Sequence, residues 1–215
     1  MNDSDFMTFA RSWLQAPKNI GAAVPSGRSL AKLMASQVDP AEDGIVVELG
    51  AGTGAITRAL LAQGISPDRL LVVEHDPKLA ALVTRKMPQL NVICADARTL
   101  RQSLATNASN TTIAAIISSL PLLSMPRHLR WRIAVECQRT LGEHGKLIQF
   151  TYGPFSPLPD RLLHFLGWRA KRVGMVWDNF PPATVWHYEH ENKITHVQEC
   201  VAMGFDDPRL ENLVD

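Results

Sequence analysis

The sequence lacks long apolar runs and a secretion signal, and it contains few cysteines. No uninterrupted apolar stretch reaches the roughly 18 residues that a membrane-spanning helix needs. The opening residues Met-Asn-Asp-Ser-Asp carry no positive flank of the kind that begins a signal peptide. The three cysteines, Cys94, Cys137 and Cys200, are odd in number and widely spaced, which favours free thiols over a disulfide framework. These absences predict a cytoplasmic protein.

The chain also lacks a surplus of either charge. Its 22 Lys and Arg residues oppose 21 Asp and Glu residues, for a formal net charge of +1. A chain this close to neutral has no broad basic surface for nucleic acid, so we expect no nucleic-acid partner. It has no internal repeat and no low-complexity linker. Its 215 residues are enough for one domain with a full hydrophobic core.

What the sequence does contain is a glycine-rich turn between an apolar strand and an amphipathic helix. Residues 45–47 are Ile-Val-Val, followed by Glu48 and then by Gly50, Gly52 and Gly54. The apolar spacing of residues 55–61 suits a helix. Glycines at alternate positions allow positive φ and let a ligand touch the backbone with no Cβ in the way. The pattern predicts a buried parallel strand, a tight turn and a helix N-terminus.

Further apolar strands end in polar residues in the same way. The predicted strands are residues 45–49, 70–74, 91–97, 112–118, 146–152, 170–177 and 183–188, the last two forming an antiparallel hairpin. Glu48, Glu74, Asp96 and Ser119 fall at or near the carboxyl ends of the first four. Strands alternating with helices predict an α/β, Rossmann-like fold: a mostly parallel seven-stranded sheet with helices on both faces. Ligands bind such sheets at the carboxyl ends of the strands.

The glycine turn is compatible with two adenosine-containing cofactors. It resembles motif I of class I S-adenosylmethionine (SAM) methyltransferases, and Gly50, Gly52 and Ala55 also satisfy the relaxed dinucleotide pattern. An acid at position 74 suits the ribose of either ligand. A dinucleotide enzyme usually needs a second substrate domain, whereas the residues after the fourth strand look like the rest of one sheet. SAM, with S-adenosyl-L-homocysteine as product, is therefore the expected cofactor.

Several segments together resemble bacterial phospholipid N-methyltransferases, which convert phosphatidylethanolamine stepwise to phosphatidylcholine. The matching segments are Ala16 to Ser26, Glu48 to Gly54, Ser119 to Pro121, Gln149 to Pro154 and Val176 to Trp186. That family is itself similar to rRNA adenine dimethylases. The alternatives are therefore an rRNA adenine N6-methyltransferase, or a methyltransferase of another aminolipid or small amine. The rRNA adenine dimethylases carry Asn-Leu-Pro followed by Tyr or Phe after the fourth strand, where the Asn and the aromatic residue hold the target base. The Ser119-Leu120-Pro121-Leu122 segment supplies neither residue.

The resemblance implies a role for each candidate site residue. Glu74 would accept hydrogen bonds from the ribose hydroxyls, and Asp96 would bind the adenine amino group with the Ala97 backbone near the ring. The Gly50, Gly52 and Gly54 backbone would lie against the methionine and ribose portions, while Glu48 holds the loop or reaches the methionine ammonium through water. Ser119, which also borders the cofactor, and Tyr152 would orient the substrate amine. The Tyr152 ring could steady the cation by a cation–π contact.

The first residues form a candidate membrane-binding segment. Residues 3–16 are amphipathic at helical spacing, with a bulky aromatic face. In the lipid enzymes an amphipathic N-terminal segment is associated with membrane binding. We therefore expect residues 3–18 to bind anionic lipid reversibly at the inner face of the cytoplasmic membrane, aided by Arg11, Lys18 and Arg28.

The predicted organisation is a membrane-binding segment at 1–25, a methyltransferase domain at 26–190 and an extension of unassigned role at 191–215. No metal is expected, because the spacing of the nearby candidate ligands fits no common zinc pattern. Those ligands are His187, His190, His196 and Cys200. Three cations could meet the lipid phosphate: Lys18, Arg28 and Arg127. The aromatic residues Trp177, Trp186 and Tyr188 are expected to pack in the core of the hairpin.

Overall fold

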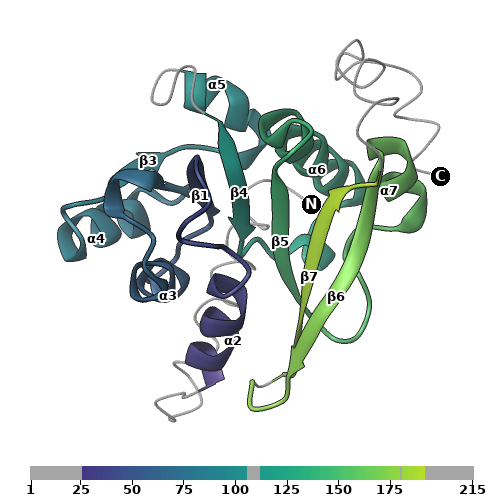
Figure 1. The fold of residues 1–215 in the computed structure, drawn as a ribbon, viewed down its shortest axis with the longest axis horizontal. Coiled ribbons are helices and arrows are strands. Elements are labelled where there is room, and N and C mark those ends of the chain that lie inside the picture. Colours follow the sequence, from purple (N-terminus) through teal and green to yellow (C-terminus); the bar gives the residue numbers. More distant parts are fainter. Residues whose placement is uncertain (1–25, 106–111, 180, 192–215) are drawn as a thin grey trace.

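Seven strands form one sheet in the order β3-β2-β1-β4-β5-β7-β6 (Figure 1). The structure is a computed structural model that describes residues 26–105, 112–179 and 181–191. The strands are β1 Ile45–Leu49, β2 Leu70–Glu74, β3 Asn91–Cys94, β4 Ile113–Ser118, β5 Lys146–Tyr152, β6 Trp168–Val176 and β7 Ala183–His190. The strands β1 to β5 pair in parallel, and β7 pairs antiparallel with both β5 and β6.

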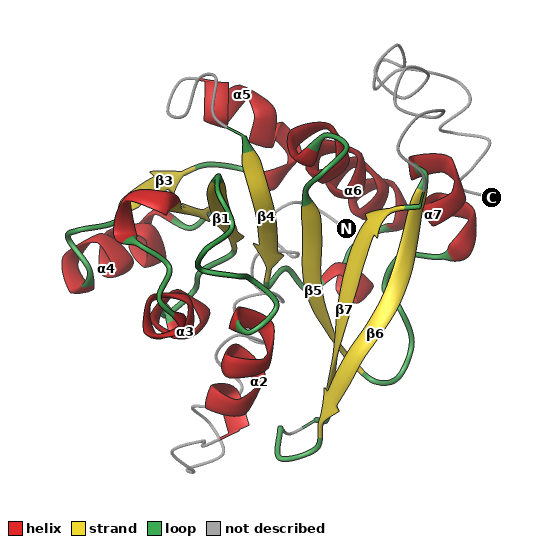
Figure 2. Cartoon of the chain, viewed as in Figure 1, coloured by secondary structure: helices red, strands yellow, loops and turns green. Residues whose placement is uncertain are grey.

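Helices alternate with strands as far as β5, and the hairpin closes the sheet (Figure 2). The α-helices are α2 Ser26–Ala35, α3 Ala55–Gln63, α4 Pro77–Lys86, α5 Leu100–Ala105, α6 Arg127–Leu141 and α7 Asp160–Leu166. Short 3-10 turns lie at η1 Pro67–Arg69, η2 Ala97–Thr99 and η3 Leu122–Ser124. Because the parallel strands point the same way, their carboxyl ends share one edge of the sheet. The predicted site residues are thereby brought together.

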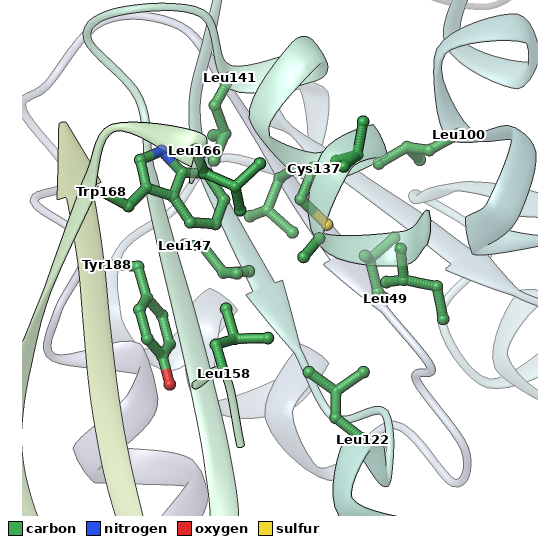
Figure 3. Close-up of a cluster of buried hydrophobic side chains, with 14 of the residues drawn as sticks. Leu49, Leu100, Leu122, Cys137, Leu141, Leu147, Leu158, Leu166, Trp168 and Tyr188 are labelled. Atoms are coloured by element: carbon green, nitrogen blue, oxygen red, sulfur yellow. The ribbon is translucent and has the colours of Figure 1, made fainter. Parts of the chain in front are cut away.

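Two hydrophobic cores lie on opposite faces of the sheet because successive strand residues point to opposite sides. On β1, Val47 and Leu49 belong to the core covered by α5, α6 and α7, where Trp168 stacks on Tyr188 with 6.2 Å between ring centroids (Figure 3). Val46 belongs to the core that packs against α2, α3 and α4. Glu48 alternates with Val47 and so faces the α3 side of the sheet.

The predicted strand order is confirmed, and the structure adds the helix α5, which the sequence did not predict; other differences lie at the ends of elements. The third strand ends at Cys94, two residues before Asp96. The helix α7 begins at Asp160, because Pro157 and Pro159 precede it and proline favours extended backbone in the residue before it. Tyr188 is buried as expected, but the expectation for Trp177 was wrong: its side chain is 75% exposed. This residue directly follows Val176, the last residue of β6, and so lies outside the paired part of the hairpin.

Part of the predicted organisation falls outside the described residues. These parts are the amphipathic stretch at 3–16, the rest of the segment 1–25 and the C-terminal residues from 192 onward. Among the described helices, none is long and apolar enough to cross a bilayer.

Candidate active site

The glycine turn between β1 and α3 takes a conformation that other residues rarely adopt. Gly50, Gly52 and Gly54 have φ values of 76°, 56° and 82°. A Cβ on Gly54 would lie 2.7 Å from the Met87 Cε, and one on Gly50 would lie 3.1 Å from the Leu120 Cδ2. Side chains are therefore excluded from this turn. Gly52 and Gly54 are buried within this turn, and contact between its backbone and a ligand stays a prediction.

Glu74 ties the glycine turn to the end of β2. One carboxylate oxygen accepts a hydrogen bond from the Gly52 N–H at 2.8 Å, and the other accepts one from the Asp76 N–H at 2.9 Å. The side chain is only 6% exposed. A carboxylate offers about four acceptor positions, so two remain after these backbone contacts. Glu74 can thus hold the turn and still accept the hydroxyls of a ribose.

Glu48 lies beneath the turn, fully buried, rather than lining it. Burial raises the pKa of its carboxyl to about 7, and the neighbouring Thr57 on α3 offsets part of that rise. Neither carboxylate oxygen has a hydrogen-bond partner of standard geometry among the described residues. The hydrogen bond that fastens the glycine turn comes from Glu74 instead.

Asp96 follows β3 and begins the η2 turn. Its carboxylate accepts hydrogen bonds from the Arg98 backbone N–H at 2.8 Å and from the Arg98 Nε at 2.7 Å. The His75 Nδ1 lies 3.9 Å away. Partial burial alone would raise the pKa of Asp96, but the hydrogen bonds and charge of Arg98 outweigh it and hold this pKa below its usual range. The carboxylate is thus ionised and remains partly exposed beside Ala97, where an adenine amino group could reach it.

Ser119 and Tyr152 lie in one pocket at the carboxyl ends of β4 and β5. The Ser119 N–H donates to the Leu49 carbonyl at 2.9 Å, which places the segment after β4 beside the glycine turn. Tyr152 ends β5, and its ring meets Phe150 edge to face, with centroids 5.4 Å apart. Burial raises the pKa of Tyr152, although an interaction with Asn179 opposes the rise. The structure therefore brings together the two residues predicted to orient the substrate.

This pocket has a volume of about 820 Å³ and a predominantly apolar wall. Three stretches build it: residues 119–124 after β4, residues 150–154 at the end of β5, and Met175, Trp177, Pro181 and Pro182 around the hairpin turn. Leu120 belongs both to this wall and to the surroundings of Gly50. The glycine turn and the pocket are therefore adjacent compartments separated by one leucine.

Sequence reasoning gave no role to Gln149, which supports the pocket wall. This residue is fully buried in β5, and its side-chain amide donates to the Leu120 carbonyl at 2.9 Å. Its signal in the sequence is a polar residue in the middle of a strand that is otherwise largely apolar. Buried amides are normally hydrogen-bonded, so such a residue indicates a structural contact across the sheet.

Comparison with known proteins identifies related methyltransferases. No protein-family model matches the chain. An ornithine lipid N-methyltransferase from Singulisphaera acidiphila is 29% identical over 155 residues, covering 70% of this chain and 80% of the relative. A ribosomal RNA small subunit methyltransferase A from a Bradyrhizobium species is 38% identical over 114 residues, covering 50% of this chain and 37% of the relative.

Among solved structures, the magnesium protoporphyrin IX methyltransferase from Synechocystis with bound SAM superposes with a TM-score of 0.58. Its sequence is 13% identical, and the match covers 77% of this chain and 78% of that one. The fold and the cofactor are those of a class I SAM-dependent methyltransferase. The glycine turn alone was compatible with SAM or with a dinucleotide, and the comparisons decide for SAM. The left-handed glycine turn, Glu74 at the end of β2 and the partly exposed Asp96 after β3 fit this cofactor.

The comparisons leave the acceptor of the methyl group undecided between lipid and RNA. The chain spans most of the lipid-modifying relative but little more than a third of the first rRNA-modifying one.

Proposed function

We propose that this chain transfers a methyl group from SAM to the head-group amine of phosphatidylethanolamine, and then to its mono- and dimethyl products, toward phosphatidylcholine. The reaction takes place at the surface of a membrane. The observation that carries the proposal is the apolar pocket of about 820 Å³ that opens beside the glycine turn and contains Ser119 and Tyr152. Such a pocket suits the hydrocarbon part of a lipid better than it suits a charged polynucleotide.

The pocket wall contains two polar side chains, those of Ser119 and Tyr152, that could orient the reacting amine. Ser119 and Tyr152 line the pocket at the ends of adjacent parallel strands, and the Ser119 N–H donates to the Leu49 carbonyl, next to the glycine turn. The rest of the wall is largely leucine, proline and aromatic residues. A lipid amine would place its nitrogen at the polar end and its glycerol and acyl carbons along the apolar wall.

The chemistry asks little of the protein beyond alignment. Bound SAM supplies a methyl group already activated on a sulfonium, so the side chains have to orient the nitrogen and let its proton leave. Burial keeps the phenol of Tyr152 protonated at neutral pH, because its pKa is raised above the usual value. Tyr152 therefore acts through its hydroxyl and its ring face rather than as an anionic base. Water accepts the proton that the ammonium must lose before it attacks.

A second acceptor, the amine of ornithine lipid, is favoured by one specific observation. The relative from Singulisphaera acidiphila that this chain matches over 155 residues is an ornithine lipid N-methyltransferase. The two lipids share a primary amine and acyl chains, so the same pocket could hold either. They differ in the group between them, which is a phosphate in one lipid and an amino acid in the other.

Labelled SAM and separate acceptors test the proposal. The full chain is incubated with vesicles containing phosphatidylethanolamine, with vesicles containing ornithine lipid, and with unmethylated small-subunit rRNA. Label in mono-, di- and trimethylated phosphatidylethanolamine is the expected result. Label in ornithine lipid with none in phosphatidylethanolamine would identify ornithine lipid as the substrate. Label in rRNA alone would overturn the lipid assignment.

The predicted membrane segment belongs to the same proposal. Residues 3–18 would hold the enzyme on anionic lipid, and residues 26–190 would carry the reaction. A truncated chain that begins at residue 19 should then keep SAM affinity and lose most of its binding to anionic vesicles.

A further inference from the structure

Three large hydrophobic side chains of the described residues stay exposed, and all three belong to the surroundings of one pocket. Leu123 is 46% exposed, Phe155 is 78% exposed and Trp177 is 75% exposed. Leu123 and Trp177 line the pocket at the ends of β4 and β5, and Phe155 directly follows the lining residue Pro154. Single exposed apolar residues are ordinary, but three around one opening indicate an interaction surface.

The segments that carry Leu123 and Phe155 are fastened to each other. Arg130 on α6 donates from its Nη1 to the Pro157 carbonyl at 3.0 Å, which ties the helix after η3 to the loop after β5. The same loop is anchored at Ser156, whose hydroxyl lies 2.8 Å from the Tyr188 hydroxyl. Leu123 and Phe155 therefore belong to segments whose backbone is anchored, while their own side chains remain exposed.

The turn that carries Trp177 is also anchored. The Asp178 carboxylate accepts a hydrogen bond from the Ser29 hydroxyl at 2.7 Å, and the Asn179 side chain donates to the Pro181 carbonyl at 2.8 Å. Ser29 lies on the first turn of α2, so the described chain begins beside this hairpin turn (Figure 1). The predicted membrane segment precedes α2 in the sequence and thus joins the fold at this end.

The charge next to these side chains favours an anionic surface. The stretch 119–132, which carries Leu123, contains three arginines and no acid, and its Arg127 is exposed. The strand β6, which leads to Trp177, contains the exposed Lys171 and Arg172, whereas its Arg169 is paired with Glu189 at the far end of the strand. Two acids also lie near these side chains: the exposed Asp178 directly follows Trp177 and accepts a hydrogen bond from Ser29, and Asp160 follows Phe155 by five residues. Apolar tips flanked by cations are the composition of surfaces that bind anionic lipid.

We infer that Leu123, Phe155 and Trp177, here called the apolar rim, insert into the interfacial layer of an anionic lipid bilayer and seat the pocket mouth directly on it. Tryptophan in particular favours this layer, because its ring is apolar and its N–H can remain hydrated. A lipid would then enter the pocket from the bilayer without its chains crossing water. This inference rests on the proposed function, and it adds a second contact with the membrane that is independent of residues 3–18.

The test measures the partition of the full chain onto vesicles of phosphatidylethanolamine and phosphatidylglycerol, by flotation. The double variant Phe155→Ser/Trp177→Ser should bind these vesicles about tenfold or more weakly, because it removes two large apolar contacts with the interface. The conservative variant Phe155→Leu/Trp177→Phe should restore most of the binding. Ala81→Ser, an exposed position on α4, is the matched control and should behave as the unaltered chain.

SAM affinity is measured by calorimetry on every variant. A variant that keeps its SAM affinity is folded, so a loss of vesicle binding then comes from the substituted rim side chains. Unchanged vesicle binding by the double variant, with unchanged SAM affinity, would overturn the inference. So would a chain that self-associates through these residues, detected as a dimer that Phe155→Ser/Trp177→Ser makes monomeric while vesicle binding persists. If the unaltered chain binds vesicles through the apolar rim but methylates only RNA, the proposed function is wrong and the inference that the rim binds the bilayer is supported. If the unaltered chain methylates lipid and the double variant still binds vesicles as tightly, the inference about the rim is wrong and the proposed function is supported.

Discussion

The two compartments of the site, the glycine turn and the apolar pocket, differ in the kind of contact that builds them. Around the glycine turn the contacts are polar and made largely by backbone, as in the hydrogen bonds that the Gly52 and Asp76 N–H groups donate to Glu74. Across Leu120, the pocket between β4, β5 and the hairpin is walled by apolar side chains with few polar groups. Backbone contacts suit a cofactor that many enzymes share, whereas side-chain walls can change with the acceptor. We therefore expect the glycine turn to bind the cofactor and the apolar pocket to select the methyl acceptor.

The largest expected effect comes from breaking the polar compartment at Glu74. Glu74→Ala removes both backbone hydrogen bonds and the acceptor for the ribose, so SAM affinity should fall by about 100-fold, in line with roughly 1.5–3 kcal/mol for each bond to a charged group. Calorimetric titration with SAM measures it. Asp68→Ala removes an exposed acid outside the site and should leave the affinity unchanged. A Glu74→Ala chain that binds SAM normally would contradict the assignment of this compartment.

The next effect concerns pH and the buried carboxyl of Glu48. Its pKa is raised from 4.5 to about 7, so the folded chain holds a proton there that the unfolded chain releases. Stability should therefore fall as the pH rises from about 4.5 to 7, by an amount on the order of 3 kcal/mol, and stay low above pH 7.

Glu48→Gln removes this titration. Denaturant unfolding at pH 5 and pH 8 should show a smaller pH dependence for the variant than for the unaltered chain, with the variant the more stable of the two at pH 8. Equal pH dependence in both chains would show that Glu48 does not titrate in this range.

A smaller effect tests the apolar compartment at Tyr152. Tyr152→Ala removes the ring that faces the substrate cation, and lipid methylation should fall by about tenfold, as expected for a partly desolvated cation–π contact of roughly 1–2 kcal/mol. Tyr152→Phe keeps the ring and should retain most of the activity. SAM affinity should be unchanged in both. If the two variants lose activity equally, the hydroxyl rather than the ring orients the amine.

The sequence predicted the polar compartment better than the apolar one, for a physical reason. Buried parallel strands such as residues 70–74 are continuous apolar runs, and a polar residue at their end marks the sheet edge where ligands bind. Glu74 and Asp96 could be placed on that basis. Their contacts with Gly52 and Arg98 depend on the local path of two turns, which the strand pattern does not contain.

The apolar compartment could not be predicted because its walls come from segments far apart in the chain. Residues 119–124 and the hairpin turn at 177–182 meet only after β7 pairs with β5. The exposure of Trp177 was missed for a related reason. Alternation along β6 predicts which side chains are buried within the strand and says nothing about the first residue beyond it.

The most direct measurement of the central claim is a competition for one supply of labelled SAM. Phosphatidylethanolamine vesicles, ornithine lipid vesicles and unmethylated small-subunit rRNA are mixed at equal acceptor concentration, and the products are separated by mass spectrometry. The account predicts that most of the label enters phosphatidylethanolamine and its methylated products, and that rRNA stays unlabelled. Label concentrated in rRNA would contradict the assignment of the apolar compartment to a lipid.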